Sequence, residues 1–480
     1  MTAITARLPS ERSLGLGVAI VGLGLFGILC GVGLAIGELD ALVASLTVLG
    51  CLAVLADFRV GAVLLVVILP VQGSYLFPHS VFGFTGLNPM NLVLGATLVS
   101  YLVRGYEIKR FLPRPLLWLL IVPMIIAGLI GTLSVDHIFP DFYEMEVIHF
   151  TEWGGYLRDV MLKPLLMVLA AVLVGAALAK AKKAESFLVP IVASVWLMSL
   201  IAIGYVVAAG VSIGSLALPS SRTFFSALGM HANDLGRLYA VAYALLLFTW
   251  GETKDVRLKT VLFLTMGILT IALVLTFSRG AMVGWVMVNA LFLIWKFNAR
   301  TIGLALLAAG AALLIMPGAL VGRMSMGLVG GGADVNEFSA GRVDEIWLPL
   351  FPELFKSPIW GSGLDSTMWA KALWANMMLP VTHPHNAYIQ AILDTGLLGL
   401  ALILAYYWHV YRTARDLGSN AYLSPTMRGF YQGLVAGLLC FLVTGFAGSS
   451  LRPTPEFAFL WIAIGMMYGQ LARRPEAGAS

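Results

Sequence analysis

Two histidines stand close together in the stretch Thr382-His383-Pro384-His385-Asn386, and an apolar segment follows it. Proline cannot continue a helix from above but fits the first turn of one below, so the spacing predicts a helix that begins at Pro384. His385 and Asn386 would then lie on its first turn, where free backbone N–H groups and the helix dipole favour anions. A neutral imidazole held there can remove a proton from a hydroxyl group, so His385 is the candidate general base.

His383 precedes the proline and is expected to be extended, with a poorly fixed side chain. On the predicted helix, Gly396 and Gly399 would lie ~20° and ~40° from the direction of His385. The face below that histidine is therefore predicted to be smooth and open to a neighbouring helix or a lipid chain. Asp394 falls on the opposite face, where we expect it to pair with a basic residue of a neighbouring helix.

The hydropathy pattern described below predicts membrane-spanning helices, and several basic residues would lie on the side of the membrane opposite to most Lys and Arg. The preference of Lys and Arg for the cytoplasmic side does not explain these residues, so a bound anion is favoured. Arg279 opens an apolar helix, so a phosphate there would be bound by its guanidinium and by backbone N–H groups. Arg222 lies in the preceding outer loop, and Arg342 lies in the longest outer loop. We expect Arg279, Arg222 and Arg342, with Asn386, to bind substrate. The alternative is that such residues are helix ends or partners of acidic side chains. The same question applies to the other outer basic residues, Arg158, Lys163, Arg323 and Arg452.

Metal chemistry has two conceivable sources in this sequence, and both are weak. His383 and His385 could form a metal pair, but no third ligand has a suitable spacing. Glu38 and Asp40 form an acidic pair, but they occupy a short connection and fit turn chemistry better. We therefore expect neither a metal ion nor a cofactor.

The composition is that of a protein buried in a lipid bilayer. The chain has 480 residues, of which 59% are hydrophobic and 11% are charged. An ordinary soluble domain carries about 25% charged residues, so that class is excluded. The net charge of +5 comes from basic residues at helix ends rather than from one patch, so nucleic acid is not expected as a partner.

Hydropathy predicts an all-α polytopic membrane protein with about 12–14 transmembrane helices. The second and third segments are short and could form one broken hairpin. The predicted spans are 14–36, 40–56, 58–72, 89–104, 115–133, 161–179, 187–209, 232–250, 259–277, 280–297, 301–318, 387–411, 429–448 and 454–472.

The loops predict how these helices are oriented. Lys and Arg cluster on one side of the predicted membrane, which must be the cytoplasmic side, and both termini fall there. The clusters lie near residues 7–12, 104–114, 180–183, 254–259, 296–300, 412–428 and 473–474. We therefore divide the chain into helices and short loops over 1–318, one long extracytoplasmic loop over 319–385, and C-terminal helices with a cytoplasmic tail over 386–480. A loop of this length is more often functional than not.

Two motifs in this framework resemble the O-antigen ligase and O-antigen polymerase superfamily. His385-Asn386, nine residues and then Gly396-Leu-Leu-Gly399 are similar to the signature H-(N/S/Q)-x9-G-x-x-G, and Ser278-Arg279-Gly280 is similar to a second element. The resemblance implies a GT-C-like, metal-independent, inverting glycosyltransferase that takes a glycan from undecaprenyl pyrophosphate. His385 would match the catalytic histidine, Arg279 one pyrophosphate-binding arginine and Arg222 the other. The run from His231 to Asp234 departs from the Asp-Pro-Asn-like element of many members.

The sequence thus predicts a multi-pass inner-membrane enzyme whose active site faces the periplasm. Its expected partners are an undecaprenyl-pyrophosphate-linked glycan donor and a lipid- or glycan-linked acceptor, and other polysaccharide assembly proteins are further candidates. O-antigen ligase, polysaccharide polymerase and protein O-oligosaccharyltransferase remain open as activities. A transporter or flippase for lipid-linked saccharides is the rival from another class, but it would place charges in mid-span and repeat its two halves.

Overall fold

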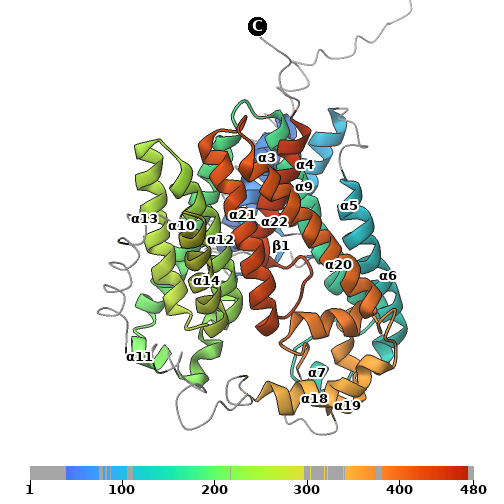
Figure 1. Cartoon of the computed structure of the whole chain (residues 1–480). Helices are drawn as coiled ribbons and strands as arrows, with labels where there is room; N and C mark the ends of the chain where they lie inside the picture. The colour runs from blue at the N-terminus through green and yellow to red at the C-terminus, as the bar shows by residue number, and fades with distance from the viewer. Residues whose placement is uncertain are drawn as a thin grey trace, which may run out of the picture.

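The computed structural model describes residues 39–74, 79–81, 84–86, 88–104, 112–216, 218–296, 341–374 and 381–473, together with residues 303, 318, 322 and 339. The described part is an all-α polytopic membrane protein (Figure 1), as predicted, with one small hairpin of β1 (Ser80–Val81) and β2 (Phe84–Thr85). Among the described residues, six helices are long and apolar enough to cross a membrane. They are Arg114–His137, Trp153–Lys180, Ala184–Ala208, Val256–Leu275, Ala387–Ser419 and Pro425–Ala447.

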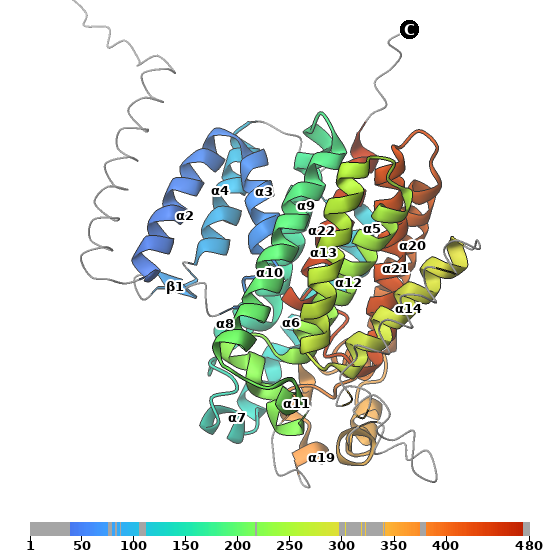
Figure 2. The same cartoon turned by 90° about the vertical axis from the view of Figure 1, so that its left-hand side faces the viewer.

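Every predicted span within the described residues coincides with one or more helices. The spans predicted at 14–36 and 301–318 lie outside the described residues, apart from residues 303 and 318. The helices of the bundle are α2 (Leu39–Ala56), α3 (Phe58–Ile68), α4 (Pro89–Val103), α5 (Arg114–Leu116), α6 (Val122–Gly131), α9 (Lys163–Lys180), α10 (Leu188–Ala208), α12 (Ala232–Glu252), α13 (Val256–Leu275), α14 (Arg279–Trp295), α20 (Ala387–Ser419), α21 (Pro425–Thr444) and α22 (Ala458–Ala472). Figure 2 shows α2, α3 and α4 side by side at one edge of this bundle.

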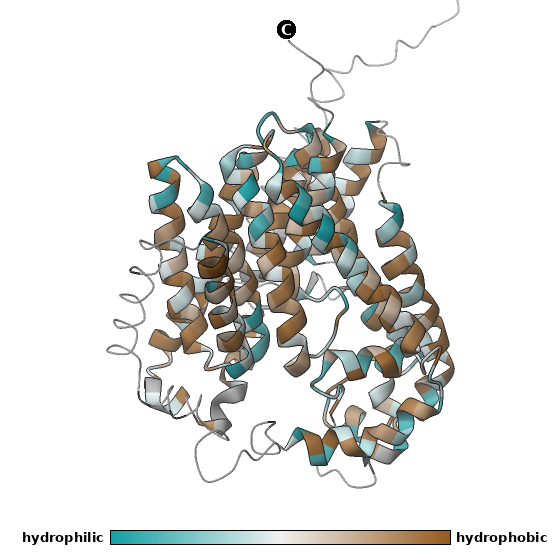
Figure 3. Cartoon of the chain, viewed as in Figure 1, coloured by the Kyte–Doolittle hydropathy of each residue, from teal (hydrophilic) through white to brown (hydrophobic). Residues whose placement is uncertain are grey.

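Helix α12 forms the centre of the bundle, and its residues from Leu235 to Thr249 are buried. It contacts α21, α13 and α14. Elsewhere glycine permits close approach of helices: a Cβ on Gly465 of α22 would lie 1.9 Å from the carbonyl oxygen of Ala171 on α9. Backbones that meet this closely are typical of helix packing inside membranes. The outer helices α6 and α13 are mostly hydrophobic along their length (Figure 3), as expected of surfaces that meet lipid.

Three short π-helical turns each precede a proline. They are η2 (Leu117–Ile121) before Pro123, η4 (Leu157–Leu162) before Pro164 and η7 (Val343–Trp347) before Pro349. The proline ring removes one backbone donor and crowds the carbonyl four residues earlier, which lies within the widened turn. Each helix therefore continues through its proline instead of ending there.

Hydrogen bonds bring several of the predicted cytoplasmic loops to one end of the bundle. Arg473 Nη2 donates to the carbonyl oxygen of Lys182 at 3.2 Å, and the hydroxyl groups of Thr253 and Thr426 are 2.8 Å apart. We call this the basic end; it comprises residues 180–185, 253–259, 420–428 and 473. The opposite end is called the site end and carries the candidate active site.

Helix α20 is broken by Gly396, whose φ of 68° and ψ of −177° are non-helical. Residues 357–363 of the outer loop, which we call the docking segment, hydrogen-bond to the backbone on both sides of this break. Leu397 N donates to Pro358 O at 2.8 Å, and Ser362 N donates to Leu393 O at 2.7 Å. A Cβ on Gly396 would lie 2.1 Å from Ile359 O. The prediction of a smooth helix face below His385 is therefore wrong, because the glycine face is occupied by the outer loop.

Candidate active site

The paired histidines lie in a loop that precedes α20 rather than in its first turn. Asn386 is the N-cap, and its Oδ1 accepts hydrogen bonds from Tyr388 N at 3.0 Å and Ile389 N at 3.2 Å. The prediction that the helix begins at Pro384 is wrong by three residues, because an asparagine cap satisfies the first helical N–H groups where proline cannot. His385 instead has a φ of 52°, a left-handed conformation that is uncommon for residues other than glycine.

Both imidazoles are held by neighbours. Their ring centroids are 4.3 Å apart with an interplanar angle of 66°, and His383 Nδ1 is 3.0 Å from Thr382 Oγ1. From the outer loop, Trp347 Nε1 donates to the carbonyl oxygen of Pro384 at 2.8 Å. The prediction that the His383 side chain is poorly fixed is therefore wrong, since its ring packs against that of His385.

The surroundings keep both histidines neutral. Burial, followed by the nearby His383, Arg342, Arg237 and His231, lowers the pKa of His385 from 6.5 to about 2. Burial likewise lowers the pKa of His383 to about 4, with Glu456 acting in the opposite direction. Each ring is therefore unprotonated at neutral pH, which is the form that a general base requires.

Arg237 lies in the second turn of α12, and sequence reasoning missed it because it falls inside a predicted span. Its side chain is 6% exposed. Nη2 donates to Asp234 Oδ1 at 2.6 Å, and Nε donates to Asn233 O at 3.2 Å. A charge within a span was itself a signal, because an ionisable residue there needs a partner or a function.

Glu456 was missed as well, and it comes from the connection between α21 and α22. Its Oε1 accepts from Ser449 Oγ at 2.9 Å and lies 3.6 Å from Arg237 Nη1. Burial raises the pKa of Glu456 to about 7, and Arg237 opposes this rise.

Contacts between helices bring the turn of Arg279 to the same end. Arg279 is the first residue of α14 after the N-cap Ser278, whose Oγ accepts from Ala281 N at 3.4 Å. A Cβ on Gly236 of α12 would lie 3.0 Å from Ser278 Cβ, so the turn of Arg279 packs against Gly236. Arg237 is the next residue of α12. A Cβ on Gly280 would lie 3.8 Å from Ala447 Cβ.

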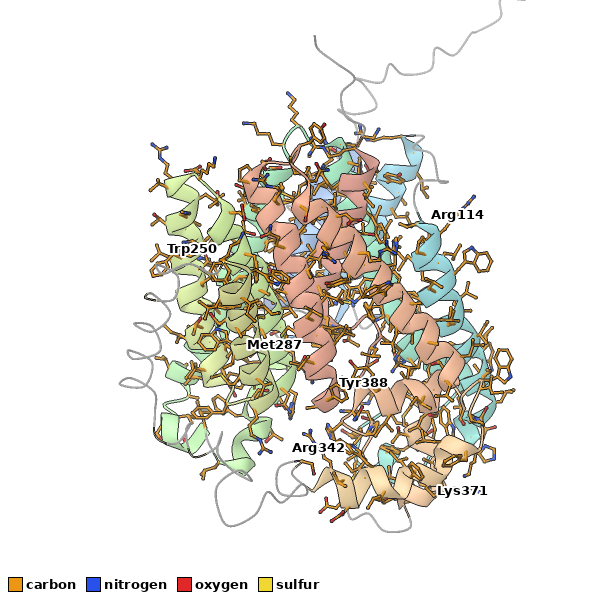
Figure 4. The ribbon with its side chains drawn as sticks, viewed as in Figure 1. Arg114, Trp250, Met287, Arg342, Lys371 and Tyr388 are labelled. Carbon is orange, nitrogen blue, oxygen red and sulfur yellow. The ribbon has the colours of Figure 1, made fainter. Side chains whose placement is uncertain are left out.

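The segment next to Ala447 contacts the start of α20. The rings of Phe446 and Tyr388 have centroids 4.6 Å apart. Arg342 precedes η7, and its charge acts on both histidines. Figure 4 shows Arg342 and Tyr388 at the site end. Arg222 falls in η6 (Pro219–Leu228), but its side chain lies outside the described residues.

Other outer basic residues are partners of carboxylates, as the alternative interpretation held. Arg158 and Lys163 both pair with Asp159, and Arg452 pairs with Asp365. Arg323 lies outside the described residues.

Asp394, for which a basic partner was expected, interacts with the charge of Arg452 and accepts its hydrogen bonds from neutral groups. Its Oδ1 accepts from Ser366 N at 3.1 Å and from Gln390 Nε2 at 2.6 Å. Because Asp365 and Ser366 both belong to the outer loop, this second polar cluster fixes that loop to α20 and to the Arg452 connection.

For metal chemistry, no three His, Cys, Asp or Glu side chains of the described residues are grouped as ligands. Glu38 and the side chain of Asp40 lie outside the described residues.

Residues 263–404 match the family model described as O-antigen ligase. The match includes Arg279, Arg342 and both histidines, and it excludes Arg237 and Glu456. Comparison with the curated proteins gave no match.

Proposed function

We propose, from the premise that residues 263–404 belong to the O-antigen ligase and polymerase superfamily, that this protein transfers a glycan from undecaprenyl pyrophosphate to a hydroxyl group of an acceptor sugar. The reaction takes place at the site end, which faces the periplasm, and the termini face the cytoplasm. It proceeds without a metal ion and with inversion, because one direct attack displaces an α-linked pyrophosphate. The acceptor belongs either to a lipid-linked core, as in a ligase, or to a growing polysaccharide, as in a polymerase.

The observation that carries this proposal is a half-buried pair of neutral histidines on which the charges of two arginines act. The ring centroids of His385 and His383 are 4.3 Å apart, and the charges of Arg237 and Arg342 act on both rings. Displacing a lipid pyrophosphate requires charge stabilisation of the leaving group and removal of a proton from the acceptor hydroxyl. Arginines supply the first by bidentate hydrogen bonds, and a neutral imidazole supplies the second.

The same electrostatics make the base respond to the donor. In the free protein, burial and nearby cations hold the pKa of His385 at about 2, which is too low for an efficient base. A bound pyrophosphate would offset the arginine charges and so raise that pKa toward neutrality. His385 thus becomes a competent base when the leaving group is in place, and water is less readily activated in its absence.

Replacing the two histidines separately tests the proposal. We expect His385→Ala to lose nearly all transfer while it still binds the lipid-linked donor, because the arginines carry that affinity. His383→Ala should retain part of the activity, since its ring supports that of His385. His409→Ala is the matched control: it lies on the same helix, with its ring stacked on Tyr468.

The measurement is restoration of mature glycan in cells that lack the protein, with donor binding measured on purified variants at matched expression. An active His385→Ala variant, or one that has lost donor binding, would remove this histidine from its role as base. In the deletion cells, accumulated single glycan units would identify a polymerase, and long unattached chains would identify a ligase.

A further inference from the structure

Arg237 has one nitrogen that the folded chain does not satisfy. Nε and Nη2 donate to Asn233 and Asp234, but among the described residues Nη1 has no hydrogen-bond partner although it is buried. Buried donors are nearly always paired, because an unpaired one loses its hydration without compensation. An unpaired guanidinium nitrogen beside two candidate catalytic histidines therefore points to a missing acceptor.

Glu456 is the acidic group nearest to that nitrogen, but it makes no hydrogen bond with it. Its Oε1 lies 3.6 Å from Nη1 and already accepts from Ser449 Oγ. A charge-assisted hydrogen bond between nitrogen and oxygen would be about 2.7–2.9 Å long. Glu456 thus compensates part of the charge of Arg237 and leaves its hydrogen-bonding capacity unused.

The position of Arg237 fits a ligand shared with the rest of the site. Its guanidinium lies 5.8 Å from the centre of the Phe457 ring, and a Cβ on Gly448 would come within 2.7 Å of Nη1. Any residue other than glycine at position 448 would place its Cβ against Nη1. The preceding residue, Gly236, packs against the turn that carries Arg279, so both arginines come from elements in contact.

We propose that Arg237 is a further phosphate-binding residue of this site, and that Glu456 takes the place of the anion while the site is empty. The ligand class is a diphosphate, which offers several oxygens to two guanidinium groups at once. Its assignment to the leaving group of the donor rests on the proposed function. The anion site itself rests on the geometry of Arg237.

Arg452 provides a matched control at the same end of the molecule. It also pairs with an aspartate, Asp365, and its side chain is 13% exposed. Its nitrogens all have acceptors, because Nη2 donates to Asp365 Oδ1, Nε to Ser450 Oγ at 3.1 Å and Nη1 to Val160 O at 3.3 Å. Replacing Arg452 therefore removes an ion pair without removing an unused donor.

The test measures binding of inorganic pyrophosphate to the full chain in phosphatidylcholine nanodiscs, by calorimetry and by the rise in melting temperature. We expect Arg237→Gln to bind about tenfold or more weakly, since one charge-assisted hydrogen bond is lost. Glu456→Gln should bind more tightly, by roughly threefold, because it no longer competes for Nη1. Arg452→Gln should melt at a lower temperature but bind pyrophosphate with unchanged affinity.

Opposite effects of the Arg237 and Glu456 variants are the result that a merely structural ion pair would not give. Unchanged affinity in Arg237→Gln, or equal weakening in both variants, would overturn the inference. If Arg237→Gln does not fold, Arg237→Lys takes its place and is compared with Glu456→Gln in the same way. We expect its affinity for pyrophosphate to lie between those of the unmodified protein and a variant without a positive charge, because lysine lacks the planar fork.

Two further arms separate the sources of phosphate and the two proposals. Added phosphatidylglycerol that abolishes pyrophosphate binding would assign Arg237 to a bilayer headgroup and overturn the inference. Pyrophosphate binding requires no transfer, so Arg237-dependent binding together with an active His385→Ala variant would sink the proposed function alone. Binding independent of Arg237 in a protein whose His385→Ala variant is inactive would sink the inference alone.

Discussion

At the scale of single residues, the proposed base is an imidazole whose surroundings lower its pKa. His385 is half-buried, lies against a second imidazole and is acted on by two guanidinium groups, all of which disfavour its charged form. Such a base has a lower pKa than a solvated histidine, so it becomes protonated only at a lower pH. A pH–rate profile measures this difference.

The first prediction concerns pH. Because the pKa of His385 is lowered from 6.5 to about 2, the imidazole of the free enzyme is neutral throughout the range above pH 5. We therefore expect kcat/KM to show no imidazole inflection as pH falls from 8 to 5.5. In contrast, kcat reports the titration of the donor complex. As pH falls, kcat should begin to decline at a higher pH than kcat/KM does, because the bound anion raises the pKa of His385.

The control for this profile is Glu456→Gln, because the pKa of Glu456 is about 7 and falls within the range examined. An inflection that disappears in this variant belongs to the carboxyl group. A loss of kcat/KM centred near pH 6.5 that persists in it would mean that His385 is solvated in the free enzyme, against the geometry described above.

The second prediction concerns Arg279 at the start of α14. Arg279→Ala should abolish transfer while the protein remains folded in the membrane, and Arg279→Lys should recover only part of the activity because lysine lacks the bidentate fork. Transfer and melting temperature are measured together. Arg158→Ala is the control, since that side chain is 45% exposed and pairs with Asp159. Full activity of Arg279→Ala would reduce the residue to a helix end.

Sequence reasoning at this scale identified residues that belong to a local motif. His385, Asn386 and Arg279 could be selected because each stands beside a recognisable neighbour in the chain. Arg237 and Glu456 could not be paired, because they are distant in sequence and only the packing of the α21–α22 connection on α12 brings them together. The left-handed backbone of His385 could not be predicted either. Both Pro384 and Asn386 are residues that can start a helix, and the sequence does not show which of them does so.

At the scale of elements, the break in α20 changes how its length is interpreted. The helix has 33 residues, and a straight helix of that length would extend about 50 Å, well beyond the ~30 Å of a bilayer core. With the break at Gly396, residues 397–419 suffice to cross the bilayer. Residues 387–395 are then part of the site end and hold Asn386 and the histidines above the spanning segment.

The third prediction tests this break. Gly396→Ala should destabilise the protein by about 2 kcal/mol or more, because its φ and ψ are almost restricted to glycine and the added methyl group would collide with Ile359 O. The measurements are melting temperature and the rate of proteolysis within residues 341–374. Gly267→Ala serves as the control, since a Cβ there meets nothing within 4 Å. Equal stability of the two variants would contradict the docking described for residues 357–363.

Hydropathy was sufficient to locate the helices but not their irregularities. A span is recognised from its length and apolar composition, which neither the π turns before Pro123 and Pro164 nor the break at Gly396 alters. Those features depend on which partner occupies a backbone group. For Gly396 the partner is the docking segment, whose contacts cannot be inferred from the helix alone.

At the scale of the whole molecule, two ends with different chemistry face away from each other. The basic end is joined by hydrogen bonds such as that of Arg473 with Lys182. The site end contains the histidines, the buried Arg237 and the described part of the outer loop. From the positive-inside rule, we propose that the basic end faces the cytoplasm.

The fourth prediction tests this orientation by labelling single cysteines with an impermeant thiol reagent, in a variant that lacks the native cysteines. We expect a cysteine at Lys356, a side chain that is 59% exposed, to be labelled in intact cells with outer-membrane access assured. A cysteine at Lys182 should be labelled only after the inner membrane is opened. The reverse pattern would place the site in the cytoplasm and contradict the choice of donor.

The α21–α22 connection has a consequence for how the protein comes into being. A ribosome delivers the segment that matches O-antigen ligase well before it delivers residues 448–457, which supply Arg452 to the outer loop and Glu456 to Arg237. A nascent chain therefore carries its histidines and Arg279 through the translocon without the groups that complete their surroundings. A chain arrested or clipped before residue 448 would keep the histidines and Arg279 but lack the pairing of Arg452 with Asp365 and of Glu456 with Arg237, so we expect its outer loop to be held less firmly.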